Sequence, residues 1–198
     1  MGPRRVIKMK TLVTGGNRGL GLQIVNRLRA ESISRHAGYD ITQDVGKIAE
    51  LSLQYDVFIN NAFDGPPHEP WANFAQTNVL QAVYFAWHAA GKTGYIVNIG
   101  SVGEKIIVAP EPAFETYRVA KAALSHASRQ CTLAFKQGVV TFKTTLITLD
   151  RLDTELSRSR SNWTGNGHDL DNVVDMIRLC LASPANTCIE EISAYVRF

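Results

Sequence analysis

The sequence predicts an α/β protein, with a doubly wound parallel sheet of about six strands between two layers of helices, a three-layer αβα arrangement. Short apolar, β-branched runs alternate with stretches of helical periodicity, which is typical of strands joined by crossover helices. The run YIVNIG at 95–100 is apolar almost throughout, as expected for a strand buried on both faces. A length of 198 residues fits one domain with one core, and we assign 1–198 to a single domain.

Each expected strand is a short run rich in apolar and β-branched residues. In chain order these runs are 11–13, 31–34, 57–59, 95–99, 139–147 and 189–196. Between them, apolar residues recur with helical spacing, which predicts helices at 20–30, 45–53, 71–90, 114–135 and 170–181.

A glycine-rich stretch, TGGNRGLG at 14–21, lies between the first expected strand and the first helix. Gly15 permits a turn, Gly19 lets the backbone approach a pyrophosphate, and Gly21 lets the helix pack close to the strand. The helix N-terminus adds free N–H groups and a positive dipole end. The motif predicts dinucleotide binding in a Rossmann-type sheet, and a tight structural turn is the alternative.

A second group of polar residues lies in and around TYRVAKAAL at 116–124. Tyr117 and Lys121 are four residues apart, so they share one face of a helix, although such a pair alone is common on helix surfaces. Ser101 and Asn61 end expected strands, where open α/β sheets carry their active sites. Asn78 falls inside an expected helix, although asparagine is a poor helix former.

Together these motifs resemble those of the short-chain dehydrogenase/reductase family. The matching stretches are TGGNRGLG, NNA, TNVLQAVYF, IVNIGS and YRVAK, in the family's order, and they span roughly residues 6–155. The resemblance implies an oxidoreductase, a carbonyl reductase or alcohol dehydrogenase, that transfers hydride between a nicotinamide cofactor and a small carbonyl or alcohol substrate.

The resemblance also implies roles for individual residues. Tyr117 would give a proton to the carbonyl oxygen, with its pKa lowered by Lys121 and by the cofactor's positive charge. Lys121 would also bond the nicotinamide ribose, Ser101 would hold the carbonyl oxygen, and Asn78 would help seat a water in a relay from Lys121 to solvent. The expected cofactor-binding residues are Gly15, Asn17, Arg18, Gly19, Leu20, Gly21, Ser34, Arg35, Asp40, Ile41, Asn61, Ala62, Tyr117, Lys121, Leu152 and Thr154. No metal site is expected.

The chain departs from the family's pattern at two motifs. Phe63 stands where the family usually has a glycine after NNA, and Leu149-Asp150 replaces a Pro-Gly before LDTEL, the segment expected to face the nicotinamide. We expect both changes to put bulk or charge near the cofactor. Neither removes a catalytic group.

A deletion is a larger departure. Only a few residues separate SISR at 32–35 from YDIT at 39–42, whereas a parallel crossover needs about a dozen residues or more. The family's helix at this place is therefore missing, and 39–42 is not expected to form the next parallel strand. The sheet edge should be trimmed, which exposes the adenine end of the cofactor and leaves Asp40 to act from a loop.

The choice of nicotinamide cofactor depends on residues near the end of the second strand. NAD binders usually place an acid there for the ribose 2′-hydroxyl, but this chain has Ser34-Arg35-His36. Arg18 adds a second cation, and arginine geometry suits a phosphate. We therefore prefer NADP(H), with NAD(H) as the alternative. The other interpretation is that Arg18 and Arg35 are solvated and contact no cofactor.

Two further function classes stay open. A catalytically silent protein that senses NADP(H) or serves as a partner subunit is favoured by Phe63 and by Leu149-Asp150. The intact set of Ser101, Tyr117, Lys121 and Asn78 disfavours it. A nucleotide-sugar epimerase or dehydratase is the other, but such relatives generally carry a longer C-terminal substrate region. The substrate itself is not readable, because Arg158, Arg160 and Trp163 fit an anion-binding segment or a solvated loop.

Composition excludes some classes of partner. A net charge of +3 is too small to indicate nucleic acid, and no apolar run approaches the roughly 18 residues of a membrane span. The N-terminus lacks the apolar region of a secretory signal. The odd, scattered set Cys131, Cys180 and Cys188 indicates a reducing, cytoplasmic compartment and suits core packing.

The resemblance also implies a homodimer or homotetramer that pairs through the helices at 71–90 and 114–135. Both are richer in apolar residues than a solvent-facing helix needs, and large exposed apolar surface tends to mark an interface. The residues in question are Val79, Val83, Trp87, Leu124 and Phe135.

Overall fold

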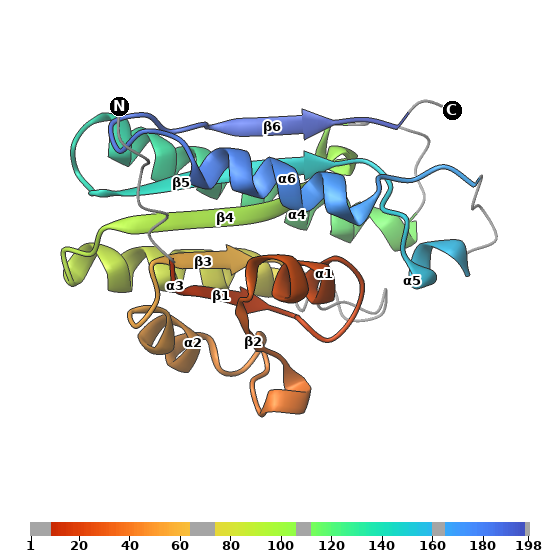
Figure 1. Ribbon diagram of the computed structural model, residues 1–198, viewed down its shortest axis with the longest axis horizontal. Coiled ribbons are helices and arrows are strands. Elements are labelled where there is room, and N and C mark those ends of the chain that lie inside the picture. Colours follow the sequence, from red (N-terminus) through yellow and green to blue (C-terminus); the bar gives the residue numbers. More distant parts are fainter. Residues whose placement is uncertain (1–8, 64–73, 106–111, 160–164, 197–198) are drawn as a thin grey trace, which may run out of the picture.

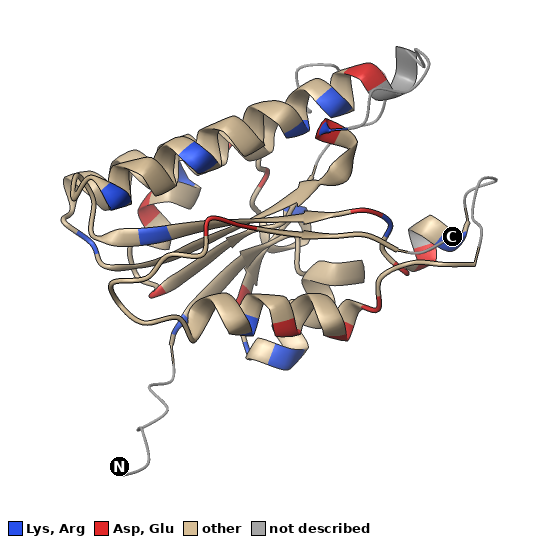
Figure 2. Cartoon of the chain, turned by 90° about the horizontal axis from the view of Figure 1, so that it is seen from above, with Lys and Arg blue, Asp and Glu red and all other residues tan. Residues whose placement is uncertain are grey.

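A computed structural model describes residues 9–63, 74–105, 112–159 and 165–196. They form one sheet of six parallel strands in the order β2-β1-β3-β4-β5-β6, with helices on both faces (Figure 1). Figure 2 views the molecule from above and shows the strands between two helical layers. The expected fold class is confirmed. The assignment of 1–198 to one domain stays a prediction.

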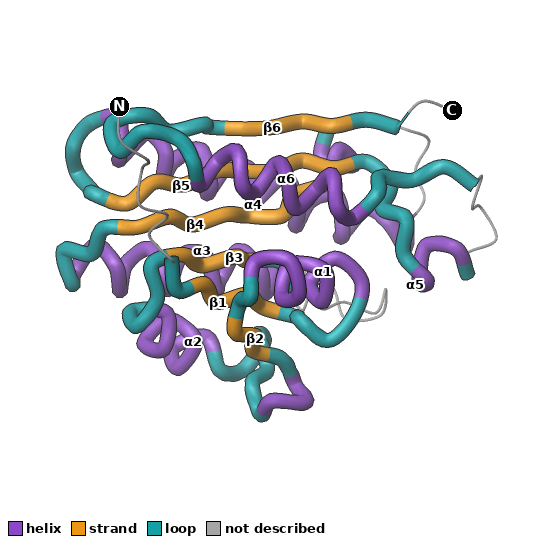
Figure 3. Tube along the Cα trace, in the orientation of Figure 1, coloured by secondary structure: helices purple, strands orange, loops and turns teal. Residues whose placement is uncertain are grey.

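All six expected strands are present, and Figure 3 shows how they alternate with helices. The strands are β1 (Thr11–Thr14), β2 (Glu31–Ile33), β3 (Val57–Asn60), β4 (Gly94–Ser101), β5 (Phe142–Leu149) and β6 (Glu191–Ala194). β5 begins later than expected because 137–139 still close the preceding helix, with the Val139 N–H donating to the Ala134 carbonyl.

The five expected helices are also present. They are α1 (Gly19–Leu28), α2 (Val45–Ser52), α3 (Ala75–Ala89), α4 (Pro112–Lys136) and α6 (Leu170–Leu181). Residues 71–73 of the expected third helix lie outside the described residues. The short helix α5 (Glu155–Arg158) and the 3-10 turns η1 (Arg35–Ala37) and η3 (Val102–Glu104) were not expected from periodicity, because each is about one turn long.

The core has two halves, one on each face of the sheet. Leu12, Phe58 and Ile96 face the layer of α2, α3 and α4, whereas their neighbours Val13 and Val97 face the layer of α1 and α6. Successive strand residues point to opposite faces, so one apolar run supplies both halves. Cys131 and Cys180 are buried core residues, as expected.

The trimmed sheet edge is confirmed among the described residues. β2 is the edge strand, and the residues after it form η1 and then a turn in which the Asp44 N–H donates to the Asp40 carbonyl at 2.7 Å. The chain then enters α2 without a further strand. The sheet ends at β2 on this side, and the loop at 34–44 lies beside the first βα turn, where His36 contacts Asn17.

The residues cited for a subunit interface are largely internal, so they do not support one, and the expected homodimer or homotetramer stays a prediction. Val79, Val83, Trp87 and Leu124 are fully buried in the core, because they lie on the faces of α3 and α4 that pack against the sheet. No described helix is long and apolar enough to cross a membrane. The cytoplasmic location stays a prediction.

Candidate active site

Most of the expected site residues lie at the carboxyl ends of the parallel strands. The glycine loop follows β1, Asn61 and Ala62 follow β3, Ser101 ends β4, and Thr154 lies just after β5. These strand ends are where open α/β sheets bind ligands.

The glycine turn and the NNA motif brace each other. The Thr14 hydroxyl accepts the N–H groups of Asn61 and Ala62 at 2.9 and 2.8 Å, and the Asn61 amide donates to the Thr14 carbonyl at 2.9 Å. Gly15 has a φ of 75°, and a Cβ on Gly21 would collide with the Gly15 carbonyl. Asn61 therefore supports the turn, and Thr14, which the motif analysis did not select, is central to it.

The N-terminus of α1 is arranged to accept an anion. Its N-cap, Arg18, provides no side-chain cap, and its first turn holds no acidic residue. The first N–H groups of a helix have no partner within the helix and carry its positive dipole end. A Cβ on Gly19 would lie 3.5 Å from the Thr154 methyl, so the glycine loop meets the segment after β5. These features fit the pyrophosphate of a dinucleotide.

Beside the helix N-terminus, the loop after β2 carries the residues expected near the adenosine ribose. The Asn17 amide lies 2.7 Å from His36 Nδ1, which ties the glycine loop to η1. The Arg18 side chain is exposed and, among the described residues, has no hydrogen bond or ion pair. Ser34 caps η1 through its backbone, accepting the Ala37 N–H at 2.9 Å.

Two of the expected contacts in this loop bind each other. Arg35 Nε donates to Asp40 Oδ2 at 2.8 Å. Asp40 also accepts from the Thr42 hydroxyl and N–H, and these bonds, helped by Arg35, lower its pKa to about 2. The resemblance placed Asp40 beside the adenine and the arginine at the ribose. In this structure they form one exposed ion pair.

Three of the expected cofactor-binding residues, and one residue at which the chain departs from the family's pattern, contribute side chains to the core. Leu20 and Ile41 have buried core side chains, and Leu152 packs against the core on the α1 side. Leu149 is buried too, at the end of β5 opposite Ala194 of β6. Its bulk therefore packs in the core, and its expected effect on the cofactor stays a prediction.

Ser101 and Tyr117 come together around Gly103. Ser101 ends β4 and its hydroxyl accepts the Gly103 N–H at 3.2 Å. A Cβ on Gly103 would lie 3.3 Å from that hydroxyl and 3.6 Å from the ring carbon Cε1 of Tyr117. Glycine at this position keeps the space between the two side chains open.

Lys121 lies one helical turn after Tyr117 and is buried, with 5% of its surface exposed. Its ammonium group donates to Gln76 Oε1 at 2.7 Å and to the Ile99 carbonyl at 3.1 Å. Burial lowers the pKa of Lys121 to about 7, while the charge of Glu104 opposes this. The lysine is therefore balanced between its charged and neutral forms near neutral pH.

Asn78 is not among the residues that contact Lys121, and its expected part in a water relay stays a prediction. Asn78 is exposed, whereas Gln76 is buried and contacts Lys121. The buried face of α3 runs through Gln76, Leu80, Val83 and Trp87, spaced by four, three and four residues. Asn78 lies about 200° around the helix from Gln76. The helical phase of the apolar residues indicates that Gln76 lies on this buried face, a signal that the motif match does not contain.

Phe63 covers the Tyr117–Lys121 pair. Its ring meets the Tyr117 ring edge to face at 5.0 Å between centroids, and Lys121 Nζ lies 5.0 Å from the centre of the Phe63 ring. The site therefore has two parts with respect to a dinucleotide. The glycine loop is open to an anion, whereas the Phe63 ring lies over the Tyr117–Lys121 part.

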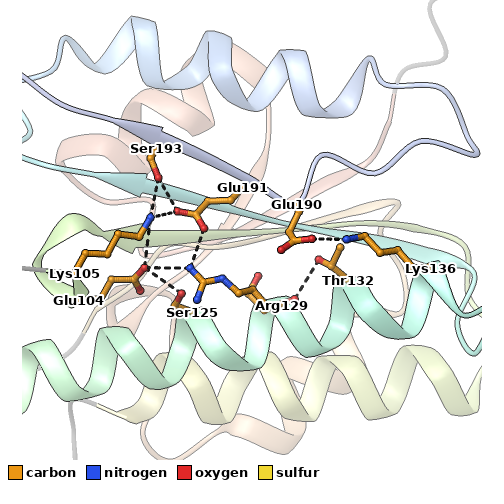
Figure 4. Close-up of polar contacts among 10 residues, drawn as sticks. Glu104, Lys105, Ser125, Arg129, Thr132, Lys136, Glu190, Glu191 and Ser193 are labelled. Carbon is orange, nitrogen blue, oxygen red and sulfur yellow. Dashed lines mark hydrogen bonds and ion pairs between the residues drawn. The ribbon is translucent and has the colours of Figure 1, made fainter.

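A charged cluster borders the site and joins η3, α4 and β6 (Figure 4). Ser125, one turn after Lys121, donates to Glu104 at 3.1 Å, and Arg129 contacts Glu104 at 3.8 Å and Glu191 at 3.0 Å. Lys105 binds Glu191 as well. Burial raises the pKa of Glu104; burial also opposes ionisation of Glu191, but hydrogen bonds from Lys105, Ser193 and Arg129 lower its pKa to about 2.

The cluster fixes the turn that follows Ser101. Sequence reasoning missed it, because its members lie far apart in the chain. Among the described residues, no group of three histidine, cysteine or acidic side chains is placed to hold a metal ion. The catalytic and binding roles of the expected residues stay predictions.

No family model matches the chain, and no curated protein sequence matches it. Solved structures do. A short-chain dehydrogenase from Burkholderia cenocepacia, in complex with NADP, matches with a TM-score of 0.70 and 18% identity, over 94% of this chain and 87% of that one. An oxidoreductase of the short-chain dehydrogenase/reductase family from Burkholderia thailandensis gives a TM-score of 0.71 and 18% identity, covering 93% and 90% of the two chains.

A third match is a 3-ketoacyl-(acyl-carrier-protein) reductase from Brucella melitensis, in complex with NADH. The TM-score is 0.70 and the identity 16%, over 92% of this chain and 96% of that one. The chain therefore has the fold of short-chain dehydrogenases and reductases, as the motifs indicated. At these identities the likeness establishes the fold.

Proposed function

We propose that the chain is an oxidoreductase of the short-chain dehydrogenase/reductase type, which transfers hydride between NADP(H) and a small carbonyl or alcohol substrate with Tyr117 as the general acid and base. One observation carries the proposal. Ser101, Tyr117 and a buried Lys121 meet at the carboxyl ends of the strands, beside a helix N-terminus that is arranged for an anion.

The residues divide the work as follows. When bound, the cofactor supplies the hydride chemistry. Ser101 holds the carbonyl oxygen by a hydrogen bond, and Tyr117 gives that oxygen a proton during reduction. The positive charge of Lys121, close to the Tyr117 ring, favours the phenolate that remains. Because burial holds the pKa of Lys121 at about 7, this support weakens as the pH rises above neutrality.

The preference for NADP(H) over NAD(H) belongs to the proposal too. Exposed Arg18 and Arg35 lie at the loops where the adenosine ribose is expected, and both can give charge-assisted hydrogen bonds to a 2′-phosphate. Arg35 now binds Asp40, and this exposed ion pair costs little to exchange for a phosphate. The residues that would hold the rest of the cofactor are those of the glycine loop, Thr154, Tyr117 and Lys121.

The second candidate is a silent NADP(H)-binding protein. The position of Phe63 over Tyr117 and Lys121 favours it. NADPH oxidation with a panel of aldehydes and ketones, run beside a direct NADPH titration, separates the two. Turnover on any panel member supports the oxidoreductase. Tight NADPH binding without turnover on the whole panel supports the silent protein, and no binding of either cofactor contradicts both.

We also propose that the protein is a homodimer or homotetramer that pairs through α3 and α4. Phe85 on α3 is 66% exposed and Val119 on α4 is 59% exposed, so each of these adjacent helices carries an exposed apolar side chain that a second copy of the chain could cover. Light scattering at micromolar concentration should give a mass of at least twice 21.8 kDa. A mass near that of one chain would contradict the proposal.

A further inference from the structure

The ammonium group of Lys121 is enclosed on several sides. Gln76 of α3 and the Ile99 carbonyl of β4 accept its hydrogen bonds, and the rings of Phe63 and Tyr117 lie 5.0 and 5.8 Å from the nitrogen. The titratable or charged groups that act on it are Tyr117, on its own helix, and Glu104 of η3. Its nearest polar partner from α3 is therefore a neutral amide.

That amide is fixed in one orientation. Gln76 Nε2 donates to the Asn60 carbonyl at 2.7 Å and to the Ile99 carbonyl at 3.1 Å. A flipped amide would turn its oxygen toward two carbonyl oxygens and its NH₂ group toward an ammonium group, so every contact would become repulsive. Gln76 Oε1 must therefore face Lys121.

The backbone of Gln76 is held as firmly as its side chain. The Asn60 amide donates to the Gln76 carbonyl at 2.9 Å and to Asn98 Oδ1 at 3.0 Å, which ties the first turn of α3 to β3 and β4. Gln76 is 2% exposed. A fully bonded, buried amide of this kind is costly to move, so it sets the position of whatever it contacts.

We propose that Gln76 is the positioning residue of Lys121, from which its neutral amide oxygen accepts a direct hydrogen bond, in place of the water-mediated contact expected from an asparagine. The proposal deepens the proposed function and rests on Lys121 acting beside Tyr117. It assigns to Gln76 both the place of the ammonium group and the neutrality of its surroundings on the α3 side.

Two substitutions of Gln76 test this proposal, because they should change the pKa of Lys121 in opposite directions. Gln76→Glu places an opposite charge on Lys121 and should raise its pKa by about one to three units. Gln76→Met keeps the length of the side chain but removes the acceptor, so the pKa should fall below that of the wild type. The pKa of Lys121 is read by NMR on protein with ¹³C,¹⁵N-labelled lysine, with the signal assigned from Lys121→Arg. The pH profile of activity should move in the same directions.

Asn78→Asp is the matched control, because it makes the same change of charge on the same helix at an exposed position. It should leave the pKa of Lys121 nearly unchanged. A Lys121 pKa near the ordinary value of about 10.4 in the wild type would overturn the proposal by itself, even where a variant fails to fold. Equal shifts from Gln76→Glu and Asn78→Asp, or no shift from either Gln76 variant, would overturn it as well.

The NMR titration needs no substrate, so the two proposals fail separately. If the pKa of Lys121 changes as expected in the two variants but the protein reduces no member of the carbonyl panel, the positioning role is supported and the oxidoreductase is not. If the protein turns over a carbonyl substrate but the pKa of Lys121 is the same in the wild type and in both Gln76 variants, the oxidoreductase is supported and the positioning role of Gln76 is not.

Discussion

The two ends of the candidate site differ in how their polar groups are held. At the ribose end, the Arg35–Asp40 pair and the Asn17–His36 contact lie on exposed loops beside an edge strand. At the reacting end, Lys121 and Gln76 are buried between α3, α4 and the strand ends. Exposed pairs exchange partners at little cost, whereas a buried polar group that loses its partner costs about 1–3 kcal/mol. We therefore expect substitutions at the ribose end to change cofactor affinity moderately, and substitutions at the reacting end to cause large losses of activity.

Tyr117→Phe should have the largest effect, because it removes the proton donor while preserving the ring that packs on Phe63. The rate of NADPH oxidation with an active carbonyl substrate should fall by at least about a hundredfold. NADPH binding, followed by fluorescence titration, should stay nearly the same. Tyr84→Phe, among the core aromatics of α3, is the control. A Tyr117→Phe protein that keeps most of its rate would remove Tyr117 from the mechanism.

The ribose end should show a smaller, graded preference. Wild-type protein should bind NADPH at least about tenfold more tightly than NADH, or roughly 1.4 kcal/mol. Arg18→Ala and Arg35→Ala should each shrink this ratio by weakening NADPH while leaving NADH alone, and added salt should weaken NADPH more. Arg178→Ala on α6 is a control that carries the same loss of charge. Equal wild-type affinities for the two cofactors would show that this end does not read the 2′-phosphate.

Burial of Lys121 also predicts how the stability of the fold depends on pH. Its pKa is about 7 in the folded chain and 10.5 in the reference state, so between these values the unfolded chain binds more protons. The free energy of unfolding should therefore rise with pH across this window, by up to about 1.4 kcal/mol per unit. Denaturant unfolding at several pH values measures the slope. Lys121→Met should have a flatter slope than the wild type, and parallel slopes would place the lysine in solvent.

Phe63 should give the smallest effect. Phe63→Gly removes the ring that covers Lys121 and Tyr117, so a cofactor no longer has to displace it. A cation–π contact of about 0.5–1 kcal/mol corresponds to NADPH binding roughly threefold tighter in the variant. Leu179→Ala, which removes an exposed apolar side chain on α6, should leave NADPH binding unchanged. Weaker NADPH binding by Phe63→Gly would mean that the ring contacts the cofactor instead of competing with it.

The sequence was sufficient for the layout of strands and helices, because alternating apolar runs and helical spacing are local signals. The motifs likewise located Ser101, Tyr117 and Lys121, which the structure brings to one place. Gln76 was missed because a motif match took precedence over the helical phase that buries it. The Arg35–Asp40 pair and the contacts of Glu104 depend on how loops and distant segments meet, and no local pattern records that.

The charged cluster around Glu191 has a consequence for local motion. Through Lys105 and Arg129 it fastens the last strand, near the end of the chain, to the turn that begins at Ser101. Segments that share such contacts open together, as one cooperative unit of hydrogen exchange. The amides of β6 and of the Ser101 turn should therefore exchange at similar rates. Opening of β6 should then also loosen the turn at Ser101, where the substrate's oxygen would be held.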